Sequence, residues 1–330
     1  ADQGFNLLYG IEQVRGSDLE GDTIRGNSAN NSIWGQGGDD TIYGIAGNNY
    51  LDGGTNNDLI FAGLGSDIMV GGSGDDIFKT YYNASGTNNT EKFGGEAKIY
   101  GGTVTLDGSG NIISSTASGS DTVDYSAITY TNYSIFADLA LEGQSVKIRE
   151  SSDLNISIKN DNIYYINNAI GTSGNDTFRG NANSNILNGS AGNNTALYTF
   201  TALTAGIVAN LQAGEVEKTT TNGTVKDTLI NIQNIKGGEG NDTFKTNFTI
   251  ANQFDGNSGN NTMDYSNANA AQSITVTLDG ANFRDVIIGN GTVDSIKNIQ
   301  NVYGGAGDDT IIGDGNSNIL DGGSGDDLIS

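Results

Sequence analysis

The residues best suited to chemistry are aspartates that recur at a fixed spacing in glycine-rich turns. From Gly26 to Lys79 the chain keeps a period of nine residues, with Asp or Asn at the sixth position and an apolar residue at the eighth. Carboxylates and turn carbonyls are the oxygen ligands that calcium prefers. The spacing therefore predicts a row of calcium sites at the sixth-position residues Asn31, Asp40, Asn49, Asp58, Asp67 and Asp76.

The elements that position these residues must be short strands. One apolar residue in nine cannot form an amphipathic helix, which needs three or four per two turns. A three-residue strand can instead bury its middle side chain, between turns of Gly, Asn and Asp. Two nonads then make a coil of eighteen residues, and the coils stack as two parallel sheets at about 4.8 Å. The predicted core residues are Ile33, Ile42, Leu51, Ile60, Met69 and Phe78.

Stacking of the coils places acidic groups close together. Sixth positions of every second nonad share an edge, so their carboxylates lie about 4.8 Å apart. Such a pair repels by roughly 1 kcal/mol in water and by more in a protein interior. A hard divalent cation between the turns reverses this interaction. Zinc and copper sites are improbable because the chain has no His and no Cys. An isolated turn of this type would be interpreted as plain surface structure.

The two edges of the first roll are expected to load calcium unevenly. One edge carries Asp22, Asp40, Asp58 and Asp76, and the other carries Asn31, Asn49 and Asp67. Asn keeps an oxygen ligand but lacks the charge that offsets the desolvation of the ion. We therefore expect a row of ions on the first edge, and sparse ions or a ladder of amides on the second.

The nine-residue pattern returns later in the chain, separated by longer units. GTSGNDTFR begins at Gly171, GGEGNDTFK at Gly237, and three further copies fill residues 304–330. Between them, SGSDTVDYS, AGNNTALYT and SGNNTMDYS are each followed by an alternating segment, at 134–141, 206–213 and 273–280. Alternation of this kind predicts half-buried strands. The Tyr125 and Tyr265 of this repeated unit are expected to serve packing.

Residues 80–117 are the least regular part. TVTLDGSGNIIS predicts a hairpin around Asp107 and Gly108. The alternative is the start of a helix-loop-helix calcium loop at Asp107, Ser109 and Asn111, but Ile112 stands where that loop needs glycine.

Composition narrows the function. The 330 residues carry a net charge of -24 with 15 Lys and Arg, which argues against nucleic acid and anionic membranes as partners. No apolar run is long enough to span a membrane. Because the chain has no cysteine, an extracellular form would need a stabilising element other than disulfides, such as a bound cation. The absence of histidine removes Ser-His-Asp, Cys-His and HExxH catalysis, so no enzyme is expected; a lyase-like site of Asp and Lys is the remaining alternative.

The turns resemble the RTX (repeats-in-toxin, hemolysin-type calcium-binding repeat) family. GGSGDDIFK and GGAGDDTII match its nine-residue pattern GGxGxDxUx, and close matches cover about a third of the chain. The resemblance implies a calcium-bound parallel β-roll in a secreted bacterial protein that leaves the cell unfolded by type I secretion. It does not specify function, because toxins, proteases, lipases, epimerases, adhesins and surface-layer proteins all carry the repeat.

The resemblance also implies the metal ligands: the sixth-position Asp and the turn carbonyls near positions two and four. Asn31, Asn49, Asn185, Asn194, Asn261 and Asn318 depart from this pattern. The implied ligands are Asp22, Gly38, Asp40, Gly54, Asp58, Gly63, Gly65, Asp67, Gly72, Gly74, Asp76, Gly174, Asp176, Gly238, Gly240, Asp242, Gly305, Gly307, Asp309, Gly323, Gly325 and Asp327.

The organisation expected from these patterns is all-β, a calcium-bound parallel β-roll or β-helix solenoid with inserted β-rich segments. Residues 1–79 form the first roll, with 1–15 as the end of a preceding unit; 80–170 are an irregular insert. Residues 171–303 hold two long units, and 304–330 a terminal roll. Residues 11–16 match the end of a later unit, so the chain is expected to be a piece of a longer one.

Outward positions seven and nine of the first roll carry apolar side chains. They are Tyr43, Leu59, Phe61 and Ile77 on one face and Trp34, Tyr50, Ile68 and Val70 on the other. Patches of this size are usually covered, here by segment 80–170 or by a neighbouring molecule. We expect a secreted, self-associating, surface-layer-like scaffold that folds in extracellular calcium. The alternatives are a calcium-stiffened segment of an adhesin, with neighbouring domains of the same chain as partners, and the tail of an exported enzyme or toxin.

Overall fold

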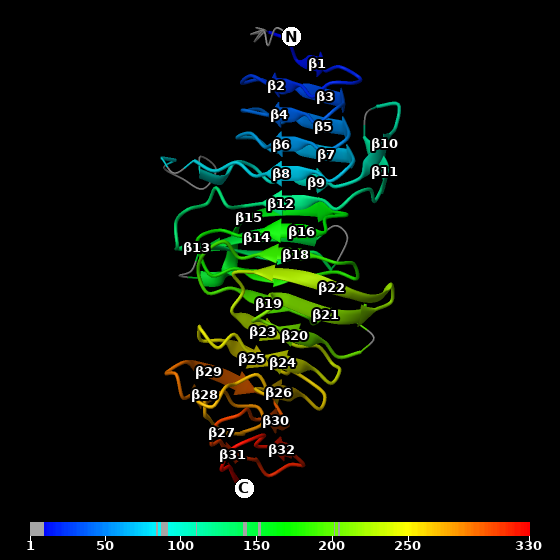
Figure 1. Cartoon of the computed structure of the whole chain (residues 1–330). Helices are drawn as coiled ribbons and strands as arrows, with labels where there is room; N and C mark the ends of the chain where they lie inside the picture. The colour runs from blue at the N-terminus through cyan, green and yellow to red at the C-terminus, as the bar shows by residue number, and fades with distance from the viewer. Residues whose placement is uncertain are drawn as a thin grey trace. The chain divides into compact units, whose positions relative to one another are not determined.

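The computed structural model describes residues 10–83, 85–86, 92–109, 111–140, 144–150, 153–200, 202–203 and 205–330. The fold is all-β and divides into two compact units, Ala1–Ser173 and Gly174–Ser330 (Figure 1). Each unit stacks short strands into two parallel sheets, with antiparallel strands inserted at intervals. The expected fold class is confirmed. Among the described residues, no helix is long and apolar enough to cross a membrane.

The first unit contains two stacked sheets and one separate hairpin. The first sheet comprises, in spatial order, β1 (Gln13–Arg15), β3 (Ser32–Gly37), β5 (Tyr50–Thr55), β7 (Ile68–Ser73), β9 (Lys98–Tyr100), β15 (Asp153–Tyr164), β14 (Gln144–Glu150) and β13 (Tyr133–Asp138). The second comprises β2 (Thr23–Arg25), β4 (Thr41–Tyr43), β6 (Leu59–Phe61), β8 (Ile77–Lys79), β12 (Thr122–Asp124) and β16 (Asn168–Ile170). The hairpin is β10 (Thr103–Leu106) with β11 (Ile112–Thr116).

The nine-residue period sets both the register and the core of this unit. Ile33 pairs with Leu51, and Leu51 with Met69, so each coil takes eighteen residues as expected. All six eighth-position side chains are 0% exposed. Burying an aliphatic side chain of this size stabilises the fold by about 1.5–3 kcal/mol. The predicted core of the first roll is therefore confirmed.

The irregular segment supplies a hairpin that lies against one outer face of the roll. β10 and β11 pair antiparallel around Asp107 and Gly108, as expected, and Asp107 Oδ1 accepts the N–H groups of Ser109 and Asn111. Thr103 and Val104 of this hairpin line a pocket of about 280 Å³ together with Trp34 and Val70. Val70, one of the outward-pointing residues of a face that was expected to be covered, is only 1% exposed.

The second unit repeats the design. Its first sheet comprises β17 (Thr177–Arg179), β19 (Thr195–Leu197), β23 (Asn234–Lys236), β25 (Gln253–Asp255), β29 (Val293–Lys297), β28 (Arg284–Ile288), β27 (Ile274–Thr277), β31 (Thr310–Ile312) and β33 (Leu328–Ile329). Its second sheet comprises β18 (Ile186–Asn188), β22 (Gly223–Ile230), β21 (Glu215–Thr220), β20 (Val208–Asn210), β24 (Thr243–Lys245), β26 (Thr262–Asp264), β30 (Asn301–Tyr303) and β32 (Ile319–Asp321).

The long repeat units add three-stranded antiparallel meanders to the ladders. The meanders are β13–β14–β15, β20–β21–β22 and β27–β28–β29. Each begins in one of the three alternating segments, which confirms that these segments are strands. In each meander the last strand pairs in parallel with a roll strand: β15 with β9, β22 with β18, and β29 with β25. Each meander therefore continues the parallel strand pairing of its sheet and adds antiparallel strands to it.

Candidate metal sites

Five aspartates form a continuous column along one edge of the first roll. They are Asp22, Asp40, Asp58, Asp76 and Asp121. The backbone N–H of each donates to Oδ1 of the next, at 2.6, 2.8, 2.8 and 2.9 Å. Sequence reasoning missed Asp121, which lies 45 residues beyond Asp76. The signal was available, because GSDTVD has the glycine, acid and hydrophobe of the nine-residue pattern in their usual places.

The second oxygen of these carboxylates has no partner. In Asp40, Asp58, Asp76 and Asp121, Oδ2 is buried without a hydrogen bond. All four residues are at most 2% exposed. A buried carboxylate oxygen without a donor is strongly unfavourable, because it has lost its water and gained nothing in return. This edge therefore presents a series of unsatisfied anionic oxygens, which suits a cation.

Glycine at the first position of each turn makes room for these oxygens. A Cβ on Gly35, Gly53 or Gly71 would lie 2.0–2.1 Å from Oδ2 of the aspartate in the same turn. Any larger residue would have to displace the carboxylate. The first-position glycine is thus explained by the acid five residues later and not by backbone conformation.

Backbone carbonyls form two further columns beside the carboxylates. Position two of successive turns is stacked so closely that a Cβ on Gly72 would lie 2.0 Å from the Gly54 oxygen. At position four, a Cβ on Gly74 would lie 2.1 Å from the Asn56 oxygen. Gly54, Gly72 and Gly74 have φ of 111°, 104° and 133°, which L side chains rarely adopt. The carbonyls expected to bind metal thus occupy successive turns on the edge that carries the unpartnered carboxylates.

The electrostatics of the column oppose ionisation without a cation. Burial, and then the neighbouring Asp76 and Asp40 charges, raise the pKa of Asp58 to about 8. Burial and the charges of Asp76 and Asp75 likewise raise the pKa of Asp121 to about 8. The pKa of Asp76 rises to about 6, mainly through burial, and that of Asp40 is also raised by burial. A divalent cation would reverse these shifts, since an adjacent positive charge favours the carboxylate.

On the opposite edge, an amide takes the place of a charge. Asn49 Nδ2 donates to the carbonyls of Gly44 and Ala46, both at 3.1 Å, and to Asp67 Oδ1 at 2.9 Å. The second oxygen of Asp67 accepts the Gly63 N–H at 2.6 Å. Both carboxylate oxygens of Asp67 therefore have donors. Turn carbonyls on this edge therefore accept N–H groups from Asn49, whereas Oδ2 of the acids on the first edge has no donor.

The same substitution recurs in the second unit. Asn194 Nδ2 donates to the carbonyls of Gly189, Ala191 and Asn231 at 3.1, 2.8 and 2.9 Å. Asn261 Nδ2 donates equivalently to Gly256, Ser258 and Asn298 at 3.0, 3.3 and 2.9 Å. In a second class of turn with Asn at position six, the residue at position two is Asn or Asp, and its backbone N–H donates to Oδ1 of the position-six Asn. The position-six residues of this class are Asn31, Asn185 and Asn318.

The other predicted acids lie in comparable turns with more complete hydrogen bonding. Oδ2 of Asp242 accepts the Gly238 N–H at 3.0 Å, and Oδ2 of Asp309 accepts the Gly305 N–H at 2.8 Å. The N–H of Asp176 donates to Asn194 at 2.8 Å, and Asp327 Oδ1 accepts the Asp309 N–H at 2.9 Å.

The remaining predicted carbonyl positions stack on their neighbours. A Cβ on the glycine at the corresponding position of the next turn would lie 2.1–2.9 Å from the oxygens of Gly63, Gly174, Gly240, Gly305 and Gly307. The Gly65 oxygen accepts the Gly95 N–H at 3.1 Å, and that of Gly238 accepts Asn257 Nδ2 at 2.8 Å. Gly38, Gly323 and Gly325 have φ of 99°, 88° and 132°. Within the described part of the chain, no three acidic side chains cluster tightly enough to hold a metal by themselves.

Two sets of polar residues were missed by sequence reasoning. At position five, a side-chain oxygen accepts the backbone N–H of the position-five residue in the next coil. Asp39 Oδ1 accepts the Asn57 N–H at 3.0 Å, and Asn57 Oδ1 accepts the Asp75 N–H at 2.8 Å. In the meanders, Asp161, Asp227 and Asp294 accept N–H groups in the manner of sixth-position acids. The shared opening of DTLINIQNIKG and DSIKNIQNVYG could have identified the last two.

Comparison with known proteins agrees with the geometry. The model of the RTX calcium-binding nonapeptide repeat matches in four copies, at residues 18–51, 43–78, 163–196 and 299–329. No curated protein matches the chain. Among solved structures, the extracellular lipase LipA from Serratia marcescens is similar at 18% identity and a TM-score of 0.22. That match covers 77% of this chain and 38% of the lipase chain.

RTX nonapeptide repeats bind calcium ions, and the proteins that carry them are typically secreted by bacteria. Unpartnered carboxylate oxygens beside columns of carbonyls are the donor set that a hard cation of this kind requires. The chain therefore carries four copies of the RTX calcium-binding nonapeptide repeat on a parallel β-roll fold.

Proposed function

We propose that this chain is a calcium-switched structural region of a secreted bacterial protein, and that it serves as a self-associating scaffold at the cell surface. The observation that carries the calcium switch is the column of four buried Oδ2 atoms without partners. The fold can bury them at little cost only when a cation is present, so binding energy becomes folding energy. Low calcium inside the cell would keep the chain unfolded for export.

We assign the ions first to the turns around Asp40, Asp58, Asp76 and Asp121. Their carboxylates would supply the charge, and carbonyls at positions two and four would complete the oxygen shell. The other residues of the sequence-based set, from Asp22 to Asp327, are proposed as ligands on the same pattern. Bound calcium would supply electrostatic attraction between successive coils that otherwise repel one another.

The test of this assignment is a calcium titration followed by circular dichroism. Asp58→Asn keeps an oxygen but removes one charge from the centre of the column. The midpoint is expected to move to at least several-fold higher calcium. Asp18→Asn is the matched control, since it makes the same charge change on an exposed acid outside the column. Equal midpoints for the two variants would contradict the assignment.

Self-association is supported by the outer face of the second sheet of the first roll. Tyr43 and Phe61 stack with ring centroids 4.5 Å apart, and the guanidinium of Arg25 lies 4.4 Å from the Tyr43 ring centroid. Ile77 on the same face is 39% exposed. The other face differs, because hairpin β10–β11 lies against Val70. An aromatic face of this kind suits contact with a second copy.

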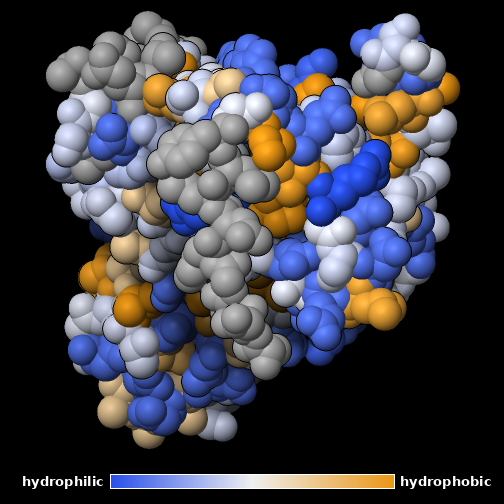
Figure 2. Space-filling view, turned by 90° about the horizontal axis from the view of Figure 1, so that it is seen from above, coloured by the Kyte–Doolittle hydropathy of each residue, from blue (hydrophilic) through white to orange (hydrophobic). Residues whose placement is uncertain are grey.

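The hydrophobic surface is divided into patches. In the view of Figure 2, orange side chains gather in separate groups among polar ones. Exposed apolar patches of this kind are candidate contact sites between molecules.

Light scattering in calcium tests the scaffold. Phe61→Asp is expected to reduce assembly, because it places a charge within the aromatic face. Trp34→Asp on the hairpin-bearing face is expected to have the smaller effect. The control is Ile113→Asp, on β11, where the side chain is already 64% exposed. If Phe61→Asp folds and assembles like the control, the scaffold proposal loses its support.

A further inference from the structure

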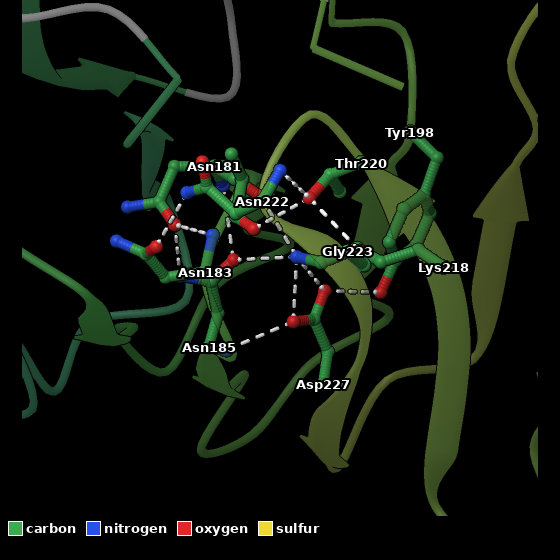
Figure 3. Close-up of polar contacts among 10 residues, drawn as sticks. Asn181, Asn183, Asn185, Tyr198, Lys218, Thr220, Asn222, Gly223 and Asp227 are labelled. Atoms are coloured by element: carbon green, nitrogen blue, oxygen red, sulfur yellow. Dashed lines mark hydrogen bonds and ion pairs between the residues drawn. The ribbon is translucent and has the colours of Figure 1, made fainter. Parts of the chain in front are cut away.

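A lysine ammonium lies buried in one of the turns of the second unit. Lys218, on β21, is 1% exposed. Its Nζ donates to the Asn181 carbonyl at 2.8 Å, to Asn185 Oδ1 at 2.9 Å and to Asp227 Oδ2 at 2.8 Å. Figure 3 shows these oxygens converging on the ammonium from the turn and from the following coil. All three acceptors are oxygen atoms.

The acceptors of Lys218 occupy the positions that the proposed function assigns to calcium in the Asp turns. Counting from Gly180, Asn181 is position two and Asn185 is position six. Asp227 is the sixth-position acid of the next coil, since β18 pairs in parallel with β22 and the Asn185 N–H donates to Asp227 Oδ1 at 2.8 Å. The ammonium thus contacts a position-two carbonyl and two successive sixth-position side chains, which are the ligand types assigned to calcium above.

The charges in this turn match a monovalent cation. Asn185 is neutral, so Asp227 is the one acid of this pair of turns, and the ammonium balances it. In the Asp58 and Asp76 turns, two acids call for a divalent ion. Four oxygen atoms lie within 2.9 Å of Nζ, including Asp227 Oδ1 at 2.6 Å, so all three N–H groups of the charged form have acceptors. Burial lowers the pKa of Lys218, and the Asp227 carboxylate opposes that lowering.

The first unit also has a buried lysine, Lys159, beside an aspartate of its meander. Lys159 is 4% exposed, and its Nζ lies 3.2 Å from Oδ1 of Asp161, an atom that also accepts the Ala97 N–H. In that meander Lys159 pairs across the strands with Ile148, two residues from the pair of Val146 with Asp161.

The equivalent pair of the second meander carries its lysine on the other strand. Lys218 pairs with Val225, two residues from the pair of Val216 with Asp227. Lysine therefore enters the same cross-strand position from opposite strands in the two meanders. A cation at this place is what the two have in common.

The third meander has no lysine at this position. Val286 pairs with Asp294, which places Ile288 where the second meander has Lys218. Ile288 is 0% exposed, and Asp294 Oδ2 accepts the Thr246 hydroxyl. A neutral donor there replaces the ammonium.

We propose that the Lys218 ammonium is a built-in cation that takes the place of calcium between the turn at Gly180 and Asp227. The proposal rests on the proposed function, in which calcium occupies the equivalent place in the Asp turns. It divides the turns of this chain into three kinds: those that need calcium, those closed by an Asn amide, and those closed by lysine.

The experiment counts calcium ions in the folded chain. Anomalous diffraction from calcium-loaded crystals of residues 1–330 should show ions in the Asp turns and none beside Lys218. In Lys218→Ala combined with Asn185→Asp, the turn loses its ammonium and gains the second acid that a divalent ion calls for, so one additional calcium per chain is expected at that place, confirmed by equilibrium dialysis. Lys218→Met fills the space with an apolar chain and should gain no ion. Lys226→Ala is the control, an exposed lysine of the same meander paired with Glu215.

The outcomes separate this proposal from the one on which it rests. Crystals of the parent without calcium in any turn would refute the proposed function. Calcium in the Asp turns and also beside Lys218 would overturn the lysine proposal alone. A chain with Lys218→Ala and Asn185→Asp that folds without the additional ion, or that stays unfolded in calcium, would overturn it as well, because calcium could not then replace the ammonium.

Discussion

At the scale of single residues, the turns are governed by which atom meets each oxygen. Asp58 Oδ2 meets no donor, Asn49 supplies its own N–H groups, and Lys218 brings an ammonium to Asp227. Asp and Asn have nearly the same shape, so turns with one backbone pattern can differ in their need for metal. The chemical identity of position six and its surroundings therefore decides the metal requirement of each turn.

The first-position glycines give one prediction. Gly71→Ala places a methyl group 2.1 Å from Asp76 Oδ2, so the carboxylate must move out of the column. We expect a loss of about 1–3 kcal/mol of stability in calcium and a higher calcium midpoint. Denaturant unfolding at fixed calcium measures the first. Gly108→Ala is the control, because a Cβ there meets nothing within 4 Å; an equal effect in both variants would refute the argument.

Asn49 gives a second prediction. Asn49→Asp removes the N–H donors to Gly44, Ala46 and Asp67 and places a second carboxylate beside Asp67. Without calcium the variant should be less stable, by about 1–3 kcal/mol or more for the unsatisfied oxygens. In calcium it should bind one additional ion, measured by equilibrium dialysis. Asn48→Asp adds the same charge at an exposed neighbour, and the hypothesis fails if it gains as many ions.

The raised carboxyl pKa values give a third prediction. The pKa of Asp58 and Asp121 rises to about 8 and that of Asp76 to about 6, against 3.8 for an ordinary Asp. The metal-free fold therefore binds more protons than the unfolded chain, and this stabilising contribution is lost as pH rises from about 4 to about 8. In chelator the chain should therefore gain folded structure as pH is lowered towards 4, whereas in excess calcium the ion keeps the carboxylates ionised and the fold should not depend on pH over this range. Circular dichroism at several pH values, in chelator and in calcium, checks this; structure in chelator that is independent of pH would contradict it.

At the scale of elements, the unit of construction is a strand of three residues, extended where needed by a meander. Each meander replaces a single roll strand by three antiparallel ones and brings an acid that accepts a backbone N–H as a sixth-position acid does, namely Asp161, Asp227 or Asp294. Buried tyrosines support two of these acids: Tyr125 donates to Asp161 at 2.7 Å and Tyr198 to Asp227 at 3.0 Å. The expected packing role of Tyr125 thus includes a hydrogen bond.

The hairpin β10–β11 gives a prediction at this scale. Its strands begin and end at the paired Thr103 and Thr116, so residues 103–116 can be replaced by a short Asn-Gly turn. The roll should still fold in calcium, because its core residues are untouched. Val70 would become exposed, at a cost of up to about 1.5–3 kcal/mol, and association of the chain should increase. Thermal unfolding and light scattering measure the two effects; an unchanged stability would show that the hairpin does not cover this face.

At the scale of the whole molecule, the high net charge and the small hydrophobic core both oppose folding of the metal-free chain. The chain carries -24 charges, and the roll buries one large side chain per nine residues. Neither favours compaction without a cation. Two explanations of a calcium switch then compete, namely general screening of charge and specific occupation of the turns.

High monovalent salt separates these explanations. At 1 M salt the screening length is about 3 Å, which suppresses repulsion between exposed charges. It does not give a partner to the buried Oδ2 of Asp58. We therefore expect the chain in chelator to remain unfolded in 1 M sodium chloride and to fold when calcium is added, followed by circular dichroism. Folding in sodium chloride alone would show that screening is sufficient.

The sequence by itself determined the period, and with it much of the fold. A nine-residue repeat with one hydrophobe has few solutions, so the core from Ile33 to Phe78, the eighteen-residue coil and the parallel sheets follow from local rules. The hairpin at Asp107 and the alternating strands followed from turn chemistry and side-chain alternation for the same reason. These features depend on residues close together in the chain.

Only the tertiary structure decided how distant residues complete each turn. Asp121 joins Asp76 across 45 residues, and Lys218 reaches Asn181 across 37. The number of residues inserted between coils varies, so the sequence spacing does not reveal which side chain lies above which. Burial decided the rest: Asp58 and Asp67 have the same place in the nonad, yet one carboxylate has an unpartnered oxygen and the other has donors for both. That difference arises from the neighbouring coil, which no local pattern records.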